Sequence, residues 1–297
     1  MKTQNFKRSL SFLIITNRYD FSMSRLSKII TWNAKIIFTN PLFLVHKFYF
    51  YIEKTGLVKR KKNARFSYKN HSILIPNLGV PIITAEDIFV NETYHDLNGL
   101  QCVLDLGAYL GLSTVYLAKH NKFVVAVEPD DDCFTYLKKN TTKIKNVESH
   151  EGAIDVQQKT VTFYREFDFD TGGNTTEGSK QAQSYKVKTI DIKKLHKDHT
   201  FDGLKMNVEG AEFALFNLYI KKTSLFTYKR GIIELHFFGK NTKNWKIFVA
   251  FYALLKKQSY HTVFNRNPKI RLEDIQKEFE AFSSKGIYHC RLSFYKK

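Results

Sequence analysis

The sequence predicts an α/β protein in which helices cover both faces of a mainly parallel sheet. From residue 101 to the end, apolar strand-like runs alternate with helical segments of about 10–15 residues. One of these runs ends in the glycine-containing turn "DLGAYLG" at residues 105–111. The chain is 43% hydrophobic and 15% aromatic, which is enough apolar material for a packed core.

The expected elements follow from the local patterns. "SILIPNLGVPIIT" is typical of a hairpin around Asn77-Leu78-Gly79, and "AEDIFVNETYHDL" of a helix or loop. "KTVTFYREFDF" and "SYKVKTIDI" predict two strands around the polar loop "DTGGNTTEGSKQAQ", which we interpret as a lid over a site or as an exposed hairpin tip. The final strand follows a helix and is expected as an antiparallel edge strand. We place the other strands at 101–106, 123–128, 147–150, 203–208, 230–236, 259–265 and 287–295, and the helices at 111–120, 131–141, 210–222, 244–257 and 271–283.

The positive charge of the chain is concentrated near its beginning. The whole chain has 47 basic and 28 acidic residues, a net charge of +19. Residues 1–72 hold 15 basic residues against Asp20 and Glu53, a net of +13, so the rest of the chain carries only +6. We therefore divide the chain into a basic, aromatic extension over 1–72, expected to be helical, and a domain over 73–297.

Three interpretations of this extension remain open. Basic residues mixed with Phe, Tyr and Trp suit attachment to an anionic membrane surface. The same composition suits binding to a nucleic acid backbone, which we place second. The third interpretation is a helical cap that packs its aromatic residues on the domain. The longest apolar runs of the extension, "FLII" and "FYFYI", are far shorter than the roughly 20 residues of a membrane-spanning helix.

The cysteines and the first residues indicate the compartment. Cys102, Cys133 and Cys290 are odd in number and widely spaced, so they predict neither a disulfide framework nor a zinc site. Basic residues precede "SLSFLIIT" as in a signal peptide, but the bulky and charged residues 17–20 follow where small ones are needed. We expect a cytoplasmic protein, at the inner face of the membrane if the extension binds there.

The turn after the first buried strand predicts a ligand site. In "VLDLGAYLGLSTVYLAKH", Gly107 allows a tight turn and Gly111 allows the following helix to come close. In this fold class ligands lie at the carboxyl ends of the strands, where free N–H groups at a helix start face them. A dinucleotide site would need Gly-x-Gly-x-x-Gly and a phosphate loop Gly-Lys-Ser/Thr, and neither is present here. We therefore expect a ligand without a pyrophosphate.

Two acids specify this ligand further. Asp105 ends the first strand beside the turn, where a carboxylate repels phosphate and attracts an ammonium group. Glu128 ends the next strand, seventeen residues beyond Gly111, where an acid accepts hydrogen bonds from ribose hydroxyls. A ribose and an amino group without a pyrophosphate describe S-adenosyl-L-methionine. The alternative is a buried turn with an acid at the surface.

Four motifs, "LDLGAYLGLST", "VEP", "LKMNVEGAE" and "IIELH", occur in this order. With them, residues 73–240 resemble the FkbM family of S-adenosylmethionine-dependent methyltransferases. "EDIFVNETY" is a weaker match upstream. The resemblance implies a Rossmann-like class I methyltransferase fold with a seven-stranded sheet. It also implies methyl transfer to a hydroxyl, usually on a sugar, glycan or natural-product scaffold. Carried over by position, it implies cofactor contacts from Asp105, Gly107, Ala108, Tyr109, Gly111, Thr114, Glu128, Pro129 and, near the adenine, Ala153.

The chain departs from the family pattern at two positions. Tyr109 stands where the family usually has Asn, and Asn207 stands where it usually has Asp in Lys-x-Asp-Val-Glu-Gly-Ala-Glu. In the family an Asp there would lie near the transferred methyl group or hold a metal ion. An Asn keeps the hydrogen-bonding capacity but cannot accept a proton.

Three residues are candidates for the chemistry. A sugar hydroxyl attacks poorly unless a base takes its proton, and His236 at the end of "IIELH" is the first candidate for that base. Glu209 in "VEGAE" is the better candidate for a functional carboxylate, while Glu212 is expected to complement the positive end of a helix. Asn207, Glu209 and His236 could also bind a divalent metal, although one carboxylate does not suffice for tight binding.

We consider three functions. The first, which we favour, is an O-methyltransferase acting on a sugar, glycan or glycolipid hydroxyl, with the extension on the membrane. The second is an RNA ribose methyltransferase, which would use the charge of +19. An RNA base methyltransferase is disfavoured because no Asn/Asp-Pro-Pro-Tyr segment is present to hold a flipped base. The third is a binding protein that keeps the fold without catalysis, consistent with Asn207.

Overall fold

The computed structural model describes residues 62–77, 79–156, 160–165, 174–175, 183–239, 241–282 and 286–296. The chain divides into two compact units, Met1–Val45 and His46–Lys297, and all described residues belong to the second. The interpretations of residues 1–61 therefore lie outside the described residues. So does most of the loop "DTGGNTTEGSKQAQ", of which only residues 174–175 and 183 are described.

Strands and helices alternate along most of the described chain. The strands are β1 (Lys62–Tyr68), β2 (His71–Asn77), β3 (Cys102–Leu106), β4 (Phe123–Glu128), β5 (Val147–Glu151), β6 (Ala153–Asp155), β7 (Thr160–Arg165), β8 (Asn174–Thr175), β9 (Gln183–Asp191), β10 (Gly203–Met206), β11 (Arg230–Phe238), β12 (His261–Phe264) and β13 (Ile287–Tyr295). The helices are α4 (Val80–Phe89), α5 (Leu112–His120), α6 (Asp131–Thr141), α7 (Ile192–Asp198), α8 (Glu212–Lys221), α9 (Thr242–Lys257) and α10 (Leu272–Ala281), with 3-10 turns η1 (His95–Leu97) and η2 (Thr223–Leu225).

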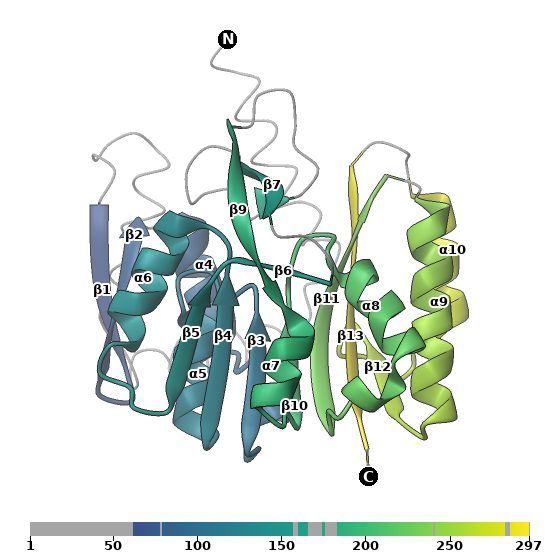
Figure 1. The fold of residues 1–297 in the computed structure, drawn as a ribbon, viewed down its shortest axis with the longest axis horizontal. Helices are drawn as coiled ribbons and strands as arrows, with labels where there is room; N and C mark the ends of the chain where they lie inside the picture. Colours follow the sequence, from purple (N-terminus) through teal and green to yellow (C-terminus); the bar gives the residue numbers. More distant parts are fainter. Residues whose placement is uncertain are drawn as a thin grey trace, which may run out of the picture. The chain divides into compact units, whose positions relative to one another are not determined.

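The main sheet confirms the predicted fold class. Its seven strands lie in the order β12-β13-β11-β10-β3-β4-β5, and β11, β10, β3, β4 and β5 run parallel to one another. In Figure 1, α7 and α8 lie in front of this sheet and α5 lies behind it. From β3 the chain continues to β4 on one side and later returns to β10 on the other. The boundary between β3 and β10 is therefore the switch point at which ligands bind in doubly wound sheets.

The two faces of the central strands have different chemistry. On one face, Leu104 and Met206 belong to a large core together with side chains of α7, α8, α9 and α10. Aromatic residues fill this core; the rings of Phe216 and Phe251 stack with centroids 4.1 Å apart. On the other face, the neighbouring strands present a polar pair, Asp105 and Lys205. In the described part of the chain, many of the aromatic residues therefore serve packing.

The expected helical extension is wrong for its last residues. Residues 62–68 form strand β1, which pairs antiparallel with β2, so the proposed boundary at 72/73 falls inside a hairpin. Its alternation is visible in the burial, because Ala64 and Phe66 are buried while residues 63, 65 and 67 are exposed. The turn residues Lys69 and Asn70 both have positive φ angles, as a two-residue hairpin turn requires. The high positive charge of this segment obscured its strand pattern.

The hairpin expected around Asn77-Leu78-Gly79 is also wrong. After β2 the chain enters helix α4, which has a proline in its first turn. Pro81 lacks an N–H, but the first turn of a helix does not need that donor. Asn77 Oδ1 accepts a hydrogen bond from Gly79 N at 2.8 Å and so turns the chain into the helix.

The last strand has the expected direction but not the expected position. β13 is antiparallel to both β11 and β12 and lies between them, so β12 is the edge strand. Residues 261–264 pair with only one end of β13, whereas β11 pairs with its whole length, so β12 is the shorter, outer strand.

Two bulk predictions can be compared with the described residues. All three cysteines are free and buried, so the chain has no disulfide framework, as predicted. Within the described part of the chain, no helix is both long and apolar enough to cross a membrane.

Candidate functional site

The glycine turn is shaped by the chain's own backbone. Gly107 has a φ of +73°, and a Cβ atom there would lie 1.8 Å from the backbone oxygen of Asn207. No other residue type fits, since the end of β10 packs directly on the turn after β3. Gly111, with a φ of +80°, would place a Cβ 2.8 Å from Leu137 Cδ1, so the close approach at this glycine is between the start of α5 and α6. Packing within the chain, against Asn207 and Leu137, therefore accounts for both glycines.

Tyr109 lies at the centre of the turn in an uncommon backbone conformation. Its φ is +54°, a region that Asn enters more readily than an aromatic residue does. The Tyr109 N–H donates to Glu128 Oε2 at 2.7 Å, which ties the turn to the end of β4.

A buried ion pair lies beneath the turn. Asp105 is fully buried, and its Oδ1 lies 3.0 Å from Lys205 Nζ on the adjacent strand. Its Oδ2 accepts hydrogen bonds from the hydroxyls of Ser113 at 2.8 Å and Thr114 at 2.7 Å. Lys205 Nζ also donates to the backbone oxygen of Gly107 at 2.6 Å. An ammonium group does meet Asp105, as the sequence suggested, but it belongs to Lys205.

Glu128 stands at the end of β4 beside the turn. Its side chain is buried, and Oε1 accepts a hydrogen bond from Asp130 N at 2.9 Å while Oε2 accepts from Tyr109 N. Burial raises the pKa of this carboxyl to about 7, although the two N–H groups and the charge of Lys205 act to lower it. Each oxygen keeps a further lone pair for a ligand hydroxyl.

The other predicted cofactor residues take different places. Thr114 and Ala108 are buried, Thr114 on Asp105 and Ala108 against Leu137, so both shape the turn rather than line a surface. Pro129 is half-buried. Ala153 begins β6 directly after Gly152, whose N–H donates to the backbone oxygen of Glu128 at 3.0 Å, so the structure brings Ala153 beside Glu128.

The predicted chemical groups meet at the ends of β10 and β11. His236 Nδ1 donates to Glu212 Oε1 at 3.0 Å, and its Nε2 lies 3.4 Å from Glu209 Oε1. Glu212 is fully buried and also accepts from Gly210 N at 2.7 Å, so it holds both the start of α8 and the imidazole. The prediction that Glu212 complements the positive end of a helix therefore accounts for its contact with Gly210 N but not for its contact with His236. Glu209 has a φ of +50°, which turns it out of the strand toward His236.

The pKa values of His236 and Glu209 in this cluster are both raised. Burial acts to lower the pKa of His236, but the hydrogen bond with Glu212 and the charges of Glu212 and Glu209 outweigh it, and the pKa is raised. Burial raises the pKa of Glu209, partly offset by the charge of His236. Both groups thus hold a proton at higher pH than they would in water, as expected for groups that exchange protons.

Asn207 joins the turn to this cluster. Its N–H donates to Leu106 O at 3.0 Å, and its own oxygen lies against Gly107. The side-chain Oδ1 is buried without a hydrogen-bond partner among the described residues. Such an unmet acceptor is uncommon in a protein interior and offers a place for a donor from a ligand.

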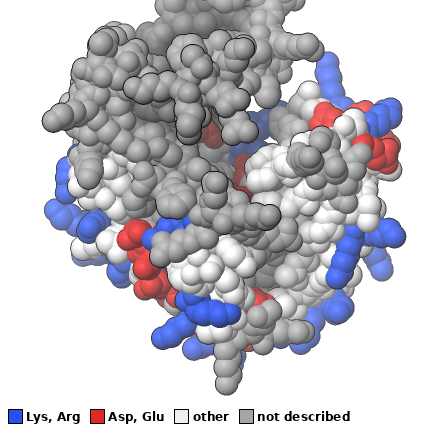
Figure 2. Space-filling model, turned by 90° about the horizontal axis from the view of Figure 1, so that it is seen from above, with Lys and Arg blue, Asp and Glu red and all other residues white. Residues whose placement is uncertain are grey.

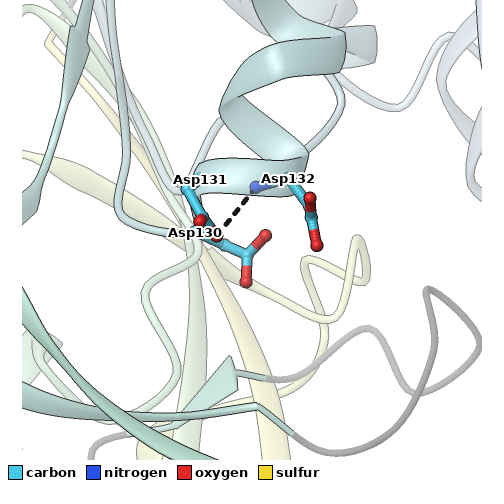
Figure 3. A group of neighbouring side chains, drawn as sticks. All are labelled: Asp130, Asp131 and Asp132. Carbon is cyan, nitrogen blue, oxygen red and sulfur yellow. Dashed lines mark hydrogen bonds between the residues drawn. The ribbon is translucent and has the colours of Figure 1, made fainter.

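The structure gives little support for a metal site. Among the described residues, the one group of three acids close enough to share an ion is Asp130, Asp131 and Asp132 at the start of α6 (Figure 3). Arg165 pairs with all three, with 2.7 Å from Nε to Asp130 Oδ2, and Tyr185 donates to Asp130 at 2.7 Å. This group therefore ties β7 and β9 to α6.

Figure 2 views the molecule from above, at the edge where the parallel strands end. On the described part of this edge, acidic and basic side chains are interspersed, and neither sign forms a continuous field.

Sequence analysis missed Lys205 and the Arg165 pairs. Lys205 is the only charged residue in the otherwise apolar strand "GLKM", and an isolated charge in a buried strand was the available indication. Arg165 had no such indication, because its partners lie more than thirty residues away in the sequence.

Replacing Lys205 with Met would leave the Asp105 carboxylate buried without its cation. We expect the free energy of unfolding, measured by urea denaturation, to fall by about 3–5 kcal/mol. The double variant Asp105→Asn/Lys205→Met removes both charges and should recover much of this loss. Lys119→Met, at an exposed position of α5, is the control and should change stability by less than about 0.5 kcal/mol. A double variant as unstable as Lys205→Met would contradict the ion-pair account.

The chain matches one family of known proteins. Residues 105–262, just over half of the chain, match the family described as methyltransferase FkbM domain. No curated protein matches the sequence.

Three solved structures are similar at low identity. M. jannaschii TYW2 in complex with AdoMet is 16% identical, with 81% of this chain and 90% of that chain covered and a TM-score of 0.40. The FkbM methyltransferase of Methylobacillus flagellatus KT is 14% identical, with coverage of 72% and 53% and a TM-score of 0.39. An O-methyltransferase from Bacillus cereus in complex with SAH is 13% identical, with coverage of 66% and 74% and a TM-score of 0.35. At these values the assignment rests on the family match, and the chain belongs to the FkbM methyltransferase family.

Proposed function

We propose that this chain transfers the methyl group of S-adenosyl-L-methionine to a hydroxyl group of a sugar, glycan or glycolipid. One observation carries the proposal. A histidine held between two carboxylates, His236 with Glu209 and Glu212, stands at the end of the strand next to β10. The end of β10 in turn packs directly on the glycine turn at Gly107. A cofactor turn and a proton acceptor are thus adjacent.

The residues around the turn fit this cofactor. Glu128 keeps lone pairs for the ribose hydroxyls, and Ala153 and Pro129 lie near it for the adenine. The free N–H groups at the start of α5 suit the carboxylate of the methionine part. The unmet Asn207 Oδ1 suits its ammonium group, because Asp105 is already occupied by Lys205. When bound, the cofactor supplies a methyl group on a sulfonium, which an acceptor oxygen displaces in line.

His236 serves as the proton acceptor for the attacking hydroxyl. The contact with Glu212 fixes the proton of the neutral ring on Nδ1, so Nε2, which faces Glu209, carries the lone pair that takes the hydroxyl proton. Glu209, 3.4 Å from Nε2, stabilises the imidazolium that forms. Because Asn207 cannot accept a proton, the base function rests on His236 in this chain.

The choice of a sugar hydroxyl rests on the family and on this base. An alcohol hydroxyl has a very high pKa, so a positioned base contributes about 10²–10⁴-fold to its reaction. A base of this kind has no clear use in a protein that only binds the cofactor. An RNA ribose hydroxyl has the same chemistry, so the substrate assay must separate the two acceptors.

Methyl transfer from isotopically labelled S-adenosyl-L-methionine to two acceptor panels tests this proposal. The full chain should label oligosaccharides or glycolipids and leave structured RNA unlabelled. His236→Ala should lower kcat by about 10²–10⁴-fold. His261→Ala, on the exposed edge strand β12, is the matched control and should keep full activity. Labelled RNA would favour the ribose methyltransferase, and no label on any acceptor despite cofactor binding would favour the binding protein.

The pH dependence of kcat provides a separate prediction. Only neutral His236 can take a proton, so activity should rise with pH through the raised pKa of this group. Glu209→Gln removes one of the carboxylates that raise this pKa, so the acidic limb of the profile should move to lower pH. Glu209→Asp keeps the charge and should restore most of the wild-type profile. An acidic limb that stays in place in Glu209→Gln would show that Glu209 does not act on His236.

A further inference from the structure

A cavity lies at the end of the sheet where β11 begins. It has a volume of about 690 Å³ and is bounded by Arg230 at the start of β11, Val263 of β12, the end of β13 and the loop 91–97. β11 runs from Arg230 to His236 over six residue steps, about 20 Å of extended strand. On the other side the cavity extends to Arg291, opposite Glu234, but none of the residues of the methyl-transfer site lines it.

The lining of this cavity is positively charged. Four cations, Arg230, Arg266, Arg291 and Lys296, face two acids, Glu92 and Asp96. Of the acids, Asp96 is paired with His95 Nε2 at 2.9 Å.

Three of these cations are available to a ligand. Arg291 is already paired: it lies 3.5 Å from the Glu234 carboxylate and donates a hydrogen bond to the Thr93 hydroxyl. Within the described residues, neither Arg230 nor Lys296 has a carboxylate partner. Arg230 donates hydrogen bonds to the backbone oxygens of residues 96 and 98. Lys296 Nζ lies 4.6 Å from the centroid of the Tyr260 ring. Arg266 has only a long contact of 3.6 Å with Asp87, and both side chains are about half exposed.

An aromatic surface adjoins these cations. Tyr295 lines the cavity, and its ring stacks on His261 with centroids 5.2 Å apart and planes 17° from parallel. Tyr295 is 40% exposed, so part of its ring remains open to a ligand. Val263 adds an apolar wall. The volume falls within the range of about 300–1,000 Å³ that is typical of small-molecule sites.

We propose that this cavity binds an organic phosphate that carries a flat ring, of the size of a nucleotide. Arg230, Arg266 and Lys296 bind the phosphoryl oxygens, since guanidinium groups match them with paired hydrogen bonds. The ring of the ligand lies on Tyr295. The proposal is independent of the methyl-transfer reaction, since it shares no residue with that site.

Calorimetric titration of the full chain with ADP tests the proposal. Saturating S-adenosylhomocysteine is added first, so that ADP cannot enter the cofactor site. We expect ADP to bind, inorganic pyrophosphate to compete with it, and adenosine to bind at least tenfold more weakly. Arg266→Ala/Lys296→Ala should weaken ADP binding at least tenfold; both side chains are exposed, so the fold should persist.

Two control variants make the outcome decisive. Arg271→Ala removes an exposed cation outside the cavity, and Glu128→Ala alters only the cofactor site; both should bind ADP as the wild type does. Absence of ADP binding, equal losses in Arg271→Ala, or a loss in Glu128→Ala would overturn the proposal. Failure of S-adenosylhomocysteine to bind would count against the methyltransferase function alone, because the loss of ADP binding in Arg266→Ala/Lys296→Ala still reports on the cavity.

Discussion

The contact between Gly107 and the backbone oxygen of Asn207 is the constraint on which the site depends. A Cβ atom at position 107 would lie 1.8 Å from that oxygen, so the ends of β3 and β10 can meet only through a glycine. This contact brings the turn after β3 beside the residues that follow β10. Segments about a hundred residues apart thereby form one site, with Glu128 on one side and His236 on the other.

Lys205 reinforces this arrangement from below. Its ammonium group pairs with Asp105 Oδ1 and donates to the backbone oxygen of Gly107, while two hydroxyls of α5 donate to Asp105 Oδ2. A buried charge is stable only when it is paired and hydrogen-bonded, and here both conditions hold. The turn, α5 and β10 are therefore tied together around one buried ion pair.

Much of the fold follows from the sequence, because buried parallel strands and their helices have distinct periods. The segments from β3 to α6 and from β10 to β13 lie within a few residues of their predicted ranges. Local patterns could not show that β13 inserts between β11 and β12, since sheet order is set by long-range pairing. They also failed at β1, where the positive charge obscured an alternating strand. At the site, position along the strands predicted where Glu128, Glu209 and His236 lie. The Lys205–Asp105 pair depends on cross-strand register, which the sequence does not display.

The central claim is that the turn and Glu128 bind S-adenosyl-L-methionine. The most direct measurement is calorimetric titration of this compound into wild type, Glu128→Ala and Glu151→Ala. Glu151 is the exposed register partner of Glu128 on β5, so it controls for the loss of a carboxylate at this edge. The account predicts binding to wild type and Glu151→Ala, and binding at least tenfold weaker, about 1.4 kcal/mol, to folded Glu128→Ala. Absence of binding to folded wild type, or equal binding by all three proteins, would contradict it.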